Sequence, residues 1–174
     1  EKGDMGGYHL IVLAKNYNGY KNLIKLVSRA WVDGYYMRPR TDREDLEKYH
    51  EDLIVCSACI AGEVPAKILK NDIAGAREAI EWYKNLFGDD YYLELQRHEV
   101  RDPHQRANRE TFPLQQQANK VLMELAKEYG IKLHQRLPLC QSGQRRSPRP
   151  PALPCHRKGP RRPQPHALYE AGMV

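Results

Sequence analysis

The sequence predicts an α/β fold in which strands and helices alternate around a mainly parallel sheet, either open or closed into a barrel. Short apolar runs of strand length recur along residues 1–133, and segments with helical periodicity separate them. Turn or capping residues mark most of the boundaries between these segments. The full chain has 174 residues, and residues 1–133 suffice for one modest domain with a hydrophobic core.

The first element is a short apolar run over residues 8–14, which predicts a buried strand. Turn-rich residues 16–19 end it. Apolar residues then recur at the three- and four-residue spacing of one helix face: Leu23, Leu26, Val27, Ala30 and Trp31. Gly34 closes this first helix.

The middle of the domain repeats the alternation. Thr41, followed three residues later by Glu44, resembles a capping box that opens a short helix. Residues 53–56 predict a second buried strand. The next helix begins near Asp72, ends before Gly88 and has one apolar face: Ile73, Ala76, Ile80, Tyr83 and Phe87.

The last elements follow the same order. Residues 91–95 predict a third strand. A long helix comes next, with an apolar face made by Leu114, Ala118, Val121, Leu122, Leu125, Ala126 and Tyr129. Gly130 is expected to end it in the left-handed conformation, and residues 131–133 begin a fourth strand.

Residues that can bind metals or transfer protons follow the second and third strands, where α/β folds place their chemistry. Cys56 and Cys59 form a CxxC pair, whose spacing suits a redox pair or half of a zinc site. We interpret Cys56 as a core residue and Cys59 as the exposed ligand candidate. The alternative is that both are ordinary cysteines, since a free cysteine commonly behaves as a small buried hydrophobe.

His98 is the second ligand candidate, because it lies just past the third strand among polar residues. A lone surface histidine is the alternative. Glu63 and Glu94 have the chemistry of ligands or bases, but Glu94 alternates with two leucines and is expected to face solvent. His9 lies within the first strand and is expected to be packed rather than catalytic.

The chain changes character after Leu133. Residues 1–133 contain 20 Lys and Arg against 21 Asp and Glu, whereas residues 134–174 contain 8 basic residues against the single acid Glu170. The net charge of +6 therefore comes from a Pro/Arg-rich tail, which we predict to be disordered. Residues 1–133 and 134–174 are accordingly predicted as two separate regions.

Composition also limits the cellular setting. No run of about 18 apolar residues is present, and the start lacks the layout of a signal peptide. We therefore expect no membrane association and a cytoplasmic location. The chain starts at Glu1 rather than Met, which suggests that upstream sequence is missing.

Several strings of the sequence carry a close resemblance to a known family. They are YHLIVLAKN (8–16), GYKNLIKLVS (19–28), LIV (53–55), SACIAGE (57–63), LELQRHE (93–99) and RETFPLQQQANKV (109–121). Together they resemble the polymerase-and-histidinol-phosphatase (PHP) domain of the bacterial DNA polymerase III alpha subunit. The resemblance runs from about residue 8 to Leu133 and implies part of a distorted (β/α)7 barrel of the PHP type.

The resemblance also implies a function. Strand ends of the barrel can hold a cluster of divalent metals, Zn, Mn or Mg, which serves a 3′–5′ exonuclease in some relatives and is lost in others that keep the domain as a structural platform. The resemblance implies that the whole protein is a Mg-dependent DNA-directed DNA polymerase, a bacterial nucleotidyltransferase of DNA replication. Its implied partners are DNA, deoxynucleoside triphosphates and other replisome subunits.

Cys59 and His98 match two metal positions of the family. Its His-x-His motif and an early acidic residue are not present, and its Asp-x-His motif after the fourth strand is replaced by residues 134–139. We therefore expect this fragment alone to be inactive.

The tail resembles the same gene read in the wrong frame. When the degenerate codons of residues 134–138 are read one nucleotide later, they permit Thr-Asn-Asp-Cys-His, the missing family motif. Residues 147–149 likewise permit Ala-His-Asp, and later segments permit further family strings in order. We hypothesise a frameshift after Leu133, or a sequencing error. The alternative is a non-enzymatic nucleic-acid-binding module that uses the basic tail to neutralise phosphates.

Overall fold

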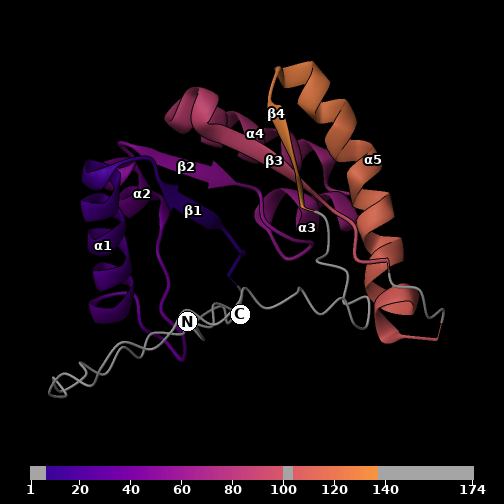
Figure 1. Ribbon diagram of the computed structural model, residues 1–174, viewed down its shortest axis with the longest axis horizontal. Coiled ribbons are helices and arrows are strands. Elements are labelled where there is room, and N and C mark those ends of the chain that lie inside the picture. Colours follow the sequence, from indigo (N-terminus) through magenta and orange to yellow (C-terminus); the bar gives the residue numbers. More distant parts are fainter. Residues whose placement is uncertain (1–6, 100–103, 137–174) are drawn as a thin grey trace, which may run out of the picture. The chain divides into compact units, whose positions relative to one another are not determined.

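The computed structural model describes residues 7–99 and 104–136 (Figure 1). In this part of the chain the elements follow one another as β1 (Ile11–Ala14), α1 (Tyr17–Val32), α2 (Arg43–Tyr49), β2 (Leu53–Cys56), α3 (Glu63–Leu69), α4 (Ile73–Phe87), η1 (Gly88–Asp90), β3 (Tyr91–Gln96), η2 (Ala107–Thr111), α5 (Phe112–Tyr129) and β4 (Lys132–Arg136). The predicted alternation of strands and helices is confirmed.

The four strands form one sheet in the order β1-β2-β3-β4. β2, β3 and β4 are parallel, whereas β1 runs antiparallel to β2. The prediction of a mixed α/β fold with a mainly parallel sheet is therefore confirmed. The seven-unit barrel stays a prediction. The predicted disordered tail begins at residue 134, but residues 134–136 lie in β4, so the prediction is wrong for them, and residues 137–174 lie outside the described residues.

The helix boundaries follow from local hydrogen bonds. Asn16 and Asp72 cap α1 and α4, because their side chains accept the backbone N–H of the residue three positions later. The Asp42 carboxylate accepts the backbone N–H of Asp45 at 2.8 Å, so Asp42 caps α2. The predicted cap at Thr41 is wrong by one residue. Gly130 ends α5 with φ of 63° and ψ of 36°, as predicted.

Two strands differ from their predictions. β1 lies beside only β2 in the described sheet, and Leu13 is 52% exposed, so the strand is not fully buried as expected. β4 continues to Arg136, three residues past the predicted boundary, because its backbone pairs with β3 as far as Gln96. Pairing with a neighbouring strand, rather than side-chain pattern, extends this strand.

The helix α3 was not predicted. It has only seven residues, and Pro65 near its start resembles a helix breaker in the sequence. Proline is tolerated in the first turn of a helix, where the backbone N–H has no intrahelical partner. Val64, Pro65 and Ile68 are buried, so packing stabilises this short helix.

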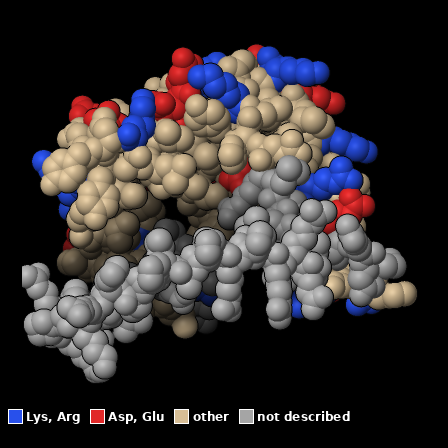
Figure 2. Space-filling model, in the orientation of Figure 1, with Lys and Arg blue, Asp and Glu red and all other residues tan. Residues whose placement is uncertain are grey.

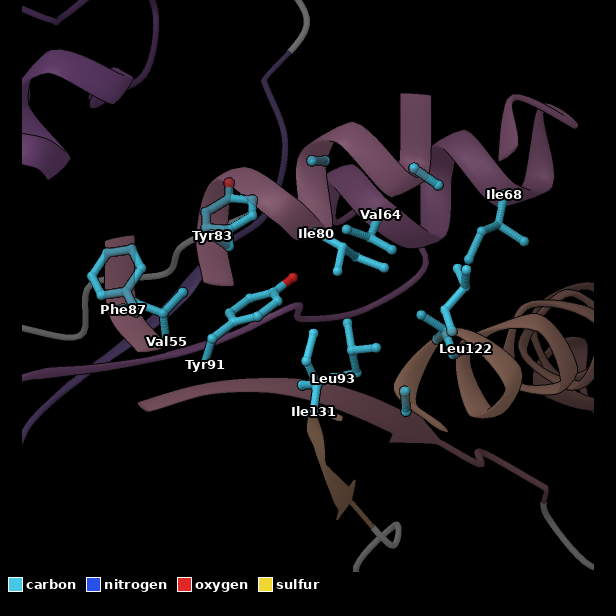
Figure 3. Close-up of a cluster of buried hydrophobic side chains, with 14 of the residues drawn as sticks. Val55, Val64, Ile68, Ile80, Tyr83, Phe87, Tyr91, Leu93, Leu122 and Ile131 are labelled. Atoms are coloured by element: carbon cyan, nitrogen blue, oxygen red, sulfur yellow. The ribbon is translucent and has the colours of Figure 1, made fainter. Parts of the chain in front are cut away.

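The hydrophobic core lies between the central strands and helices α3, α4 and α5 (Figure 3). Val55 of β2, Leu93 of β3 and Ile80 of α4 are fully buried. The rings of Tyr83 and Tyr91 stack with their centroids 5.1 Å apart. This packing fixes the ends of β2 and β3 relative to α5, and the candidate site lies at those ends.

Candidate functional site

A small hollow, open to solvent, lies at the ends of β2 and β3 beside α5. Its polar lining comes from three segments, with Cys59 on the loop after β2, Glu94 and Gln96 on β3, and Gln115 and Asn119 on α5. Apolar side chains of α3 and α5 complete the wall. The parallel order of β2 and β3 brings their following segments to the same edge of the sheet.

The loop that carries Cys59 is tight. Ala58 has φ of 60°, a left-handed conformation that residues other than glycine adopt at a cost. A Cβ on Gly62 would lie 2.0 Å from the carbonyl oxygen of Ser57, so only glycine fits there. The backbone N–H of Gly62 donates to the Cys59 carbonyl at 2.7 Å. These constraints fix the position of Cys59 in the lining of the hollow.

The Cys59 thiol lies beside His9. His9 Nδ1 is 3.2 Å from Cys59 Sγ, and the backbone N–H of Ala61 donates to the same sulfur at 3.4 Å. The backbone N–H of His9 donates to the Ala61 carbonyl at 3.0 Å, which fixes the segment before β1 against the loop. Sequence reasoning treated His9 as a packed strand residue and missed this contact, because fifty residues separate it from Cys59.

The second cysteine of the CxxC pair is part of the core. Cys56 is 5% exposed, which agrees with its predicted role as a core residue. Burial raises the pKa of the Cys56 thiol, and the negative charge of Glu94 adds to this shift. The thiol therefore stays protonated near neutral pH, where a metal ligand or nucleophile would need to be a thiolate.

Gln115 holds His98 by two hydrogen bonds. The backbone N–H of His98 donates to Gln115 Oε1 at 2.8 Å, and Gln115 Nε2 lies 2.8 Å from His98 Nδ1. The first bond fixes the orientation of the amide, because only its oxygen can accept. The amide nitrogen must then donate to Nδ1, so the neutral imidazole carries its proton on Nε2. An imidazole in this form offers no lone pair at Nε2 to a metal.

A buried polar network connects β3 to its neighbours. Glu94 is 2% exposed, so the expectation that it faces solvent is wrong. Its backbone N–H donates to Ser57 Oγ at 2.8 Å, and its carboxylate accepts from Gln96 Nε2 at 3.0 Å. Asn119 Nδ2 donates to the Gln96 carbonyl at 2.9 Å. These bonds join the loop, β3 and α5 into one polar layer.

Glu63 has structural partners. Its carboxylate is 3.0 Å from both Lys67 Nζ and Arg43 Nη2, and it accepts a hydrogen bond of 3.1 Å from the Tyr83 hydroxyl. Burial raises the pKa of Tyr83, and the Glu63 charge raises it further, so the phenol remains a donor. Glu63 therefore connects α2, α3 and α4.

The described residues do not fit a metal cluster. In residues 7–99 and 104–136, no group of three His, Cys, Asp or Glu side chains is arranged to hold a metal ion. Cys59 is in contact with His9, and His98 is in contact with Gln115. A cluster would therefore need donors from outside the described part of the chain.

Comparison with known proteins gives a consistent set of relatives. The family model for the PHP domain matches residues 2–98. The DNA polymerase III subunit alpha of Borreliella burgdorferi is 46% identical over 135 residues, covering 76% of this chain and 11% of the relative. Those of Aquifex aeolicus and Thermus aquaticus are 41% and 38% identical over 130 and 131 residues, covering 75% of this chain and 10% of each relative.

The chain spans about a tenth of the length of the curated relatives it matches. In the described part of the chain, no helix is both long and apolar enough to cross a membrane.

Proposed function

This chain belongs to the PHP domain family, and we propose that it acts in DNA replication as the PHP segment of a polymerase of the DNA polymerase III alpha type. The observation that carries the proposal is the identity of 38–46% to three such subunits over at least 130 residues. Nucleotide transfer, and contacts with template DNA, deoxynucleoside triphosphates and other replisome subunits, belong to the whole protein in this proposal.

Within that protein, this segment acts as a structural platform. The hydrogen bonds around the hollow support this role, because the Ser57 hydroxyl joins the loop after β2 to strand β3, and the Asn119 amide joins β3 to helix α5. The Gln115 amide fixes His98 in a form that donates from Nε2. In other proteins, clustered divalent ions polarise phosphates and activate water. The described His, Cys, Asp and Glu side chains do not support such a step in this chain.

A chimeric polymerase tests the structural role. Residues 8–133 of this chain would replace the matching segment of the Aquifex aeolicus subunit, which is 41% identical. We expect the chimera to extend a primed template at a rate within about threefold of the parent. A matched control replaces the same segment with a Gly/Ser linker, which should abolish extension or folding. A chimera that folds with the parental melting temperature but does not extend primers would refute the proposal.

A metal and nuclease assay tests the catalytic alternative. The purified chain, incubated with Zn, Mn or Mg and labelled single-stranded DNA, should release no nucleotides above background. Metal analysis after dialysis should find less than one tightly bound ion per chain. Hydrolysis that depends on metal and is lost in both His98→Ala and Cys59→Ala would establish an exonuclease instead. His104→Ala serves as a control, because His104 is exposed and lies outside the hollow.

We also propose that residues 134–174 are read out of frame. Support comes from the relatives, whose matches cover about three quarters of this chain and leave about a quarter unmatched. Sequencing the encoding DNA across the Leu133 codon decides the matter. An insertion or deletion there, followed by a polymerase reading frame, supports the proposal, whereas an unchanged frame would make the basic tail a genuine nucleic-acid-binding candidate.

A further inference from the structure

The helix α1 has two apolar faces, and one of them remains on the surface. Leu26 and Ala30 are buried on the inner face. The outer face carries residues spaced three and four apart whose side chains are 45–71% exposed: Tyr17, Tyr20, Ile24, Val27 and Trp31. We call these five residues the α1 stripe. A continuous apolar surface of this kind marks an interaction site.

Aromatic rings dominate the surface around the α1 stripe. The rings of Trp31 and Tyr35 stack at 5.5 Å with an angle of 16° between their planes, and those of Tyr17 and Tyr20 lie 6.4 Å apart. Tyr35 and Tyr36, just past the helix, are 54% and 55% exposed. Rings exposed on one side present flat faces on which other planar groups can stack.

This segment is also strongly basic. Residues 15–40 contain six Lys and Arg residues against one Asp, whereas residues 1–133 as a whole contain slightly more acids than bases. Lys21 Nζ lies 4.6 Å from the centre of the Tyr17 ring, and Lys25 Nζ lies 5.5 Å from that of Tyr49. Within the described residues, neither lysine forms an ion pair. Figure 2 shows a largely uncharged surface on the left, where α1 lies, with both basic and acidic side chains at its border.

We propose that the α1 stripe, with Lys21 and Lys25, binds single-stranded DNA. Bases stack on the exposed rings, and the two ammonium groups contact phosphates, the combination used by surfaces that bind single strands without sequence preference. Lys15 and Arg29 pair with Asp90 and Asp45, so the charges of Lys21 and Lys25 are the ones that favour a polyanion over an apolar polypeptide. The choice of DNA rather than RNA rests on the proposed role in replication.

The length of the stripe suits a short strand. From Tyr17 to Trp31 the helix rises about 21 Å at ~1.5 Å per residue. At about 3.4 Å per stacked nucleotide, this distance corresponds to about six nucleotides. Single-strand sites of other folds cover ~4–16 nucleotides, so α1 alone provides a site of ordinary size.

Trp31 makes the proposal testable at the site itself. The chain has two tryptophans, and Trp82→Phe leaves Trp31 as the only one. In the full chain carrying Trp82→Phe, we expect an oligothymidylate of about eight nucleotides to quench Trp31 fluorescence with saturation at low salt. An oligouridylate of the same length measures the preference for DNA over RNA.

Charge and stacking variants give the matched comparison. Lys21→Glu with Lys25→Glu should abolish the quenching, whereas Lys120→Glu with Lys127→Glu changes the net charge equally on exposed positions of α5 and should preserve it. Each Lys→Gln change at 21 or 25 should reduce the slope of log affinity against log salt by about 0.7. Tyr20→Ala, followed by anisotropy of labelled DNA, should weaken binding roughly 5- to 100-fold. Circular dichroism confirms that each variant folds.

Three results would overturn the proposal. Labelled DNA that binds without changing Trp31 fluorescence would place binding elsewhere, for example on the tail. Equal losses in the two double charge variants would mean that only net charge matters. Trp31 shielded from a soluble quencher without DNA, together with a dimeric mass, would show that a second copy covers the stripe. None of these results affects primer extension by the chimera, so the replication proposal is tested separately.

Discussion

Replacing Gln115 by leucine should lower the free energy of unfolding by about 2 kcal/mol. Gln115 is 2% exposed, and its amide makes two hydrogen bonds of 2.8 Å to His98. Each such bond contributes about 1 kcal/mol net, and a buried group left without a partner costs about 1–3 kcal/mol. Leucine has a similar volume, so the expected loss comes from hydrogen bonding rather than from a cavity.

Urea denaturation followed by circular dichroism measures this loss. Gln116→Leu is the matched control, because Gln116 is the exposed neighbour of Gln115 on α5 and should change stability by no more than about 0.5 kcal/mol. Wild-type stability in Gln115→Leu would refute the idea that the amide stabilises this site. A loss in both would indicate an effect of leucine on the helix or on solubility.

The protonation form of His98 gives an independent test. Nitrogen chemical shifts of the imidazole should show the proton on Nε2 in the wild-type chain, since Gln115 Nε2 donates to Nδ1. Gln115→Glu keeps an acceptor for the His98 backbone N–H but has no donor for Nδ1, so the proton should move to Nδ1. A wild-type imidazole with its proton on Nδ1 would refute the assigned arrangement.

The remaining predictions concern the core and a helix end. The Tyr91 hydroxyl is buried without a hydrogen-bond partner among the described residues. Tyr91→Phe should therefore leave the free energy of unfolding at pH 7, measured in urea, unchanged or slightly higher. A loss above about 1 kcal/mol would contradict this. Burial raises the pKa of Tyr91 well above 10.0, so the unfolded chain loses this proton first, and stability present below pH 10.0 should fall as the pH rises further. Tyr91→Phe should flatten that fall, and parallel curves for the two chains would refute the assignment. Ile80 is fully buried, so Ile80→Ala should lower the free energy of unfolding by about 2–4 kcal/mol. Ile24 is 47% exposed, so Ile24→Ala should lower it by less than about 1 kcal/mol. Similar losses for the two variants in chemical denaturation would contradict the described core. Gly130 has φ of 63°, so Gly130→Ala should lower stability by about 1–2 kcal/mol and Gly130→Asn by less, a ranking that thermal denaturation can confirm or reverse.

Much of the fold was predictable because its determinants are local. The second strand and the helix over residues 73–87 lie where the sequence predicted them, since a run of apolar residues or a three- and four-residue spacing is complete within the segment itself. Gly130 likewise ends its helix through its own backbone conformation. The missed helix α3 is short, and its stability depends on burial against α4 and α5 rather than on pattern.

The candidate site was predictable only in part. Cys59 and His98 were predicted as ligand candidates from their positions after strands and from resemblance, and their role as ligands stays a prediction. Their contacts with His9 and Gln115 were not predicted. Glu94 was expected to face solvent, because alternation assumes that one face of a strand is exposed. In β3, residues that point to both faces of the sheet are buried, so that assumption fails.

By itself, the sequence determined where most strands and helices form, where most helices begin and end, and which family the chain resembles. Only the tertiary structure decided which distant groups meet: His9 with Cys59 across fifty residues, and His98 with Gln115 across seventeen. The physical reason is one of range. Caps and periodicity act within one or two turns of backbone, whereas these contacts depend on the order of the strands and on how α5 packs beside β3.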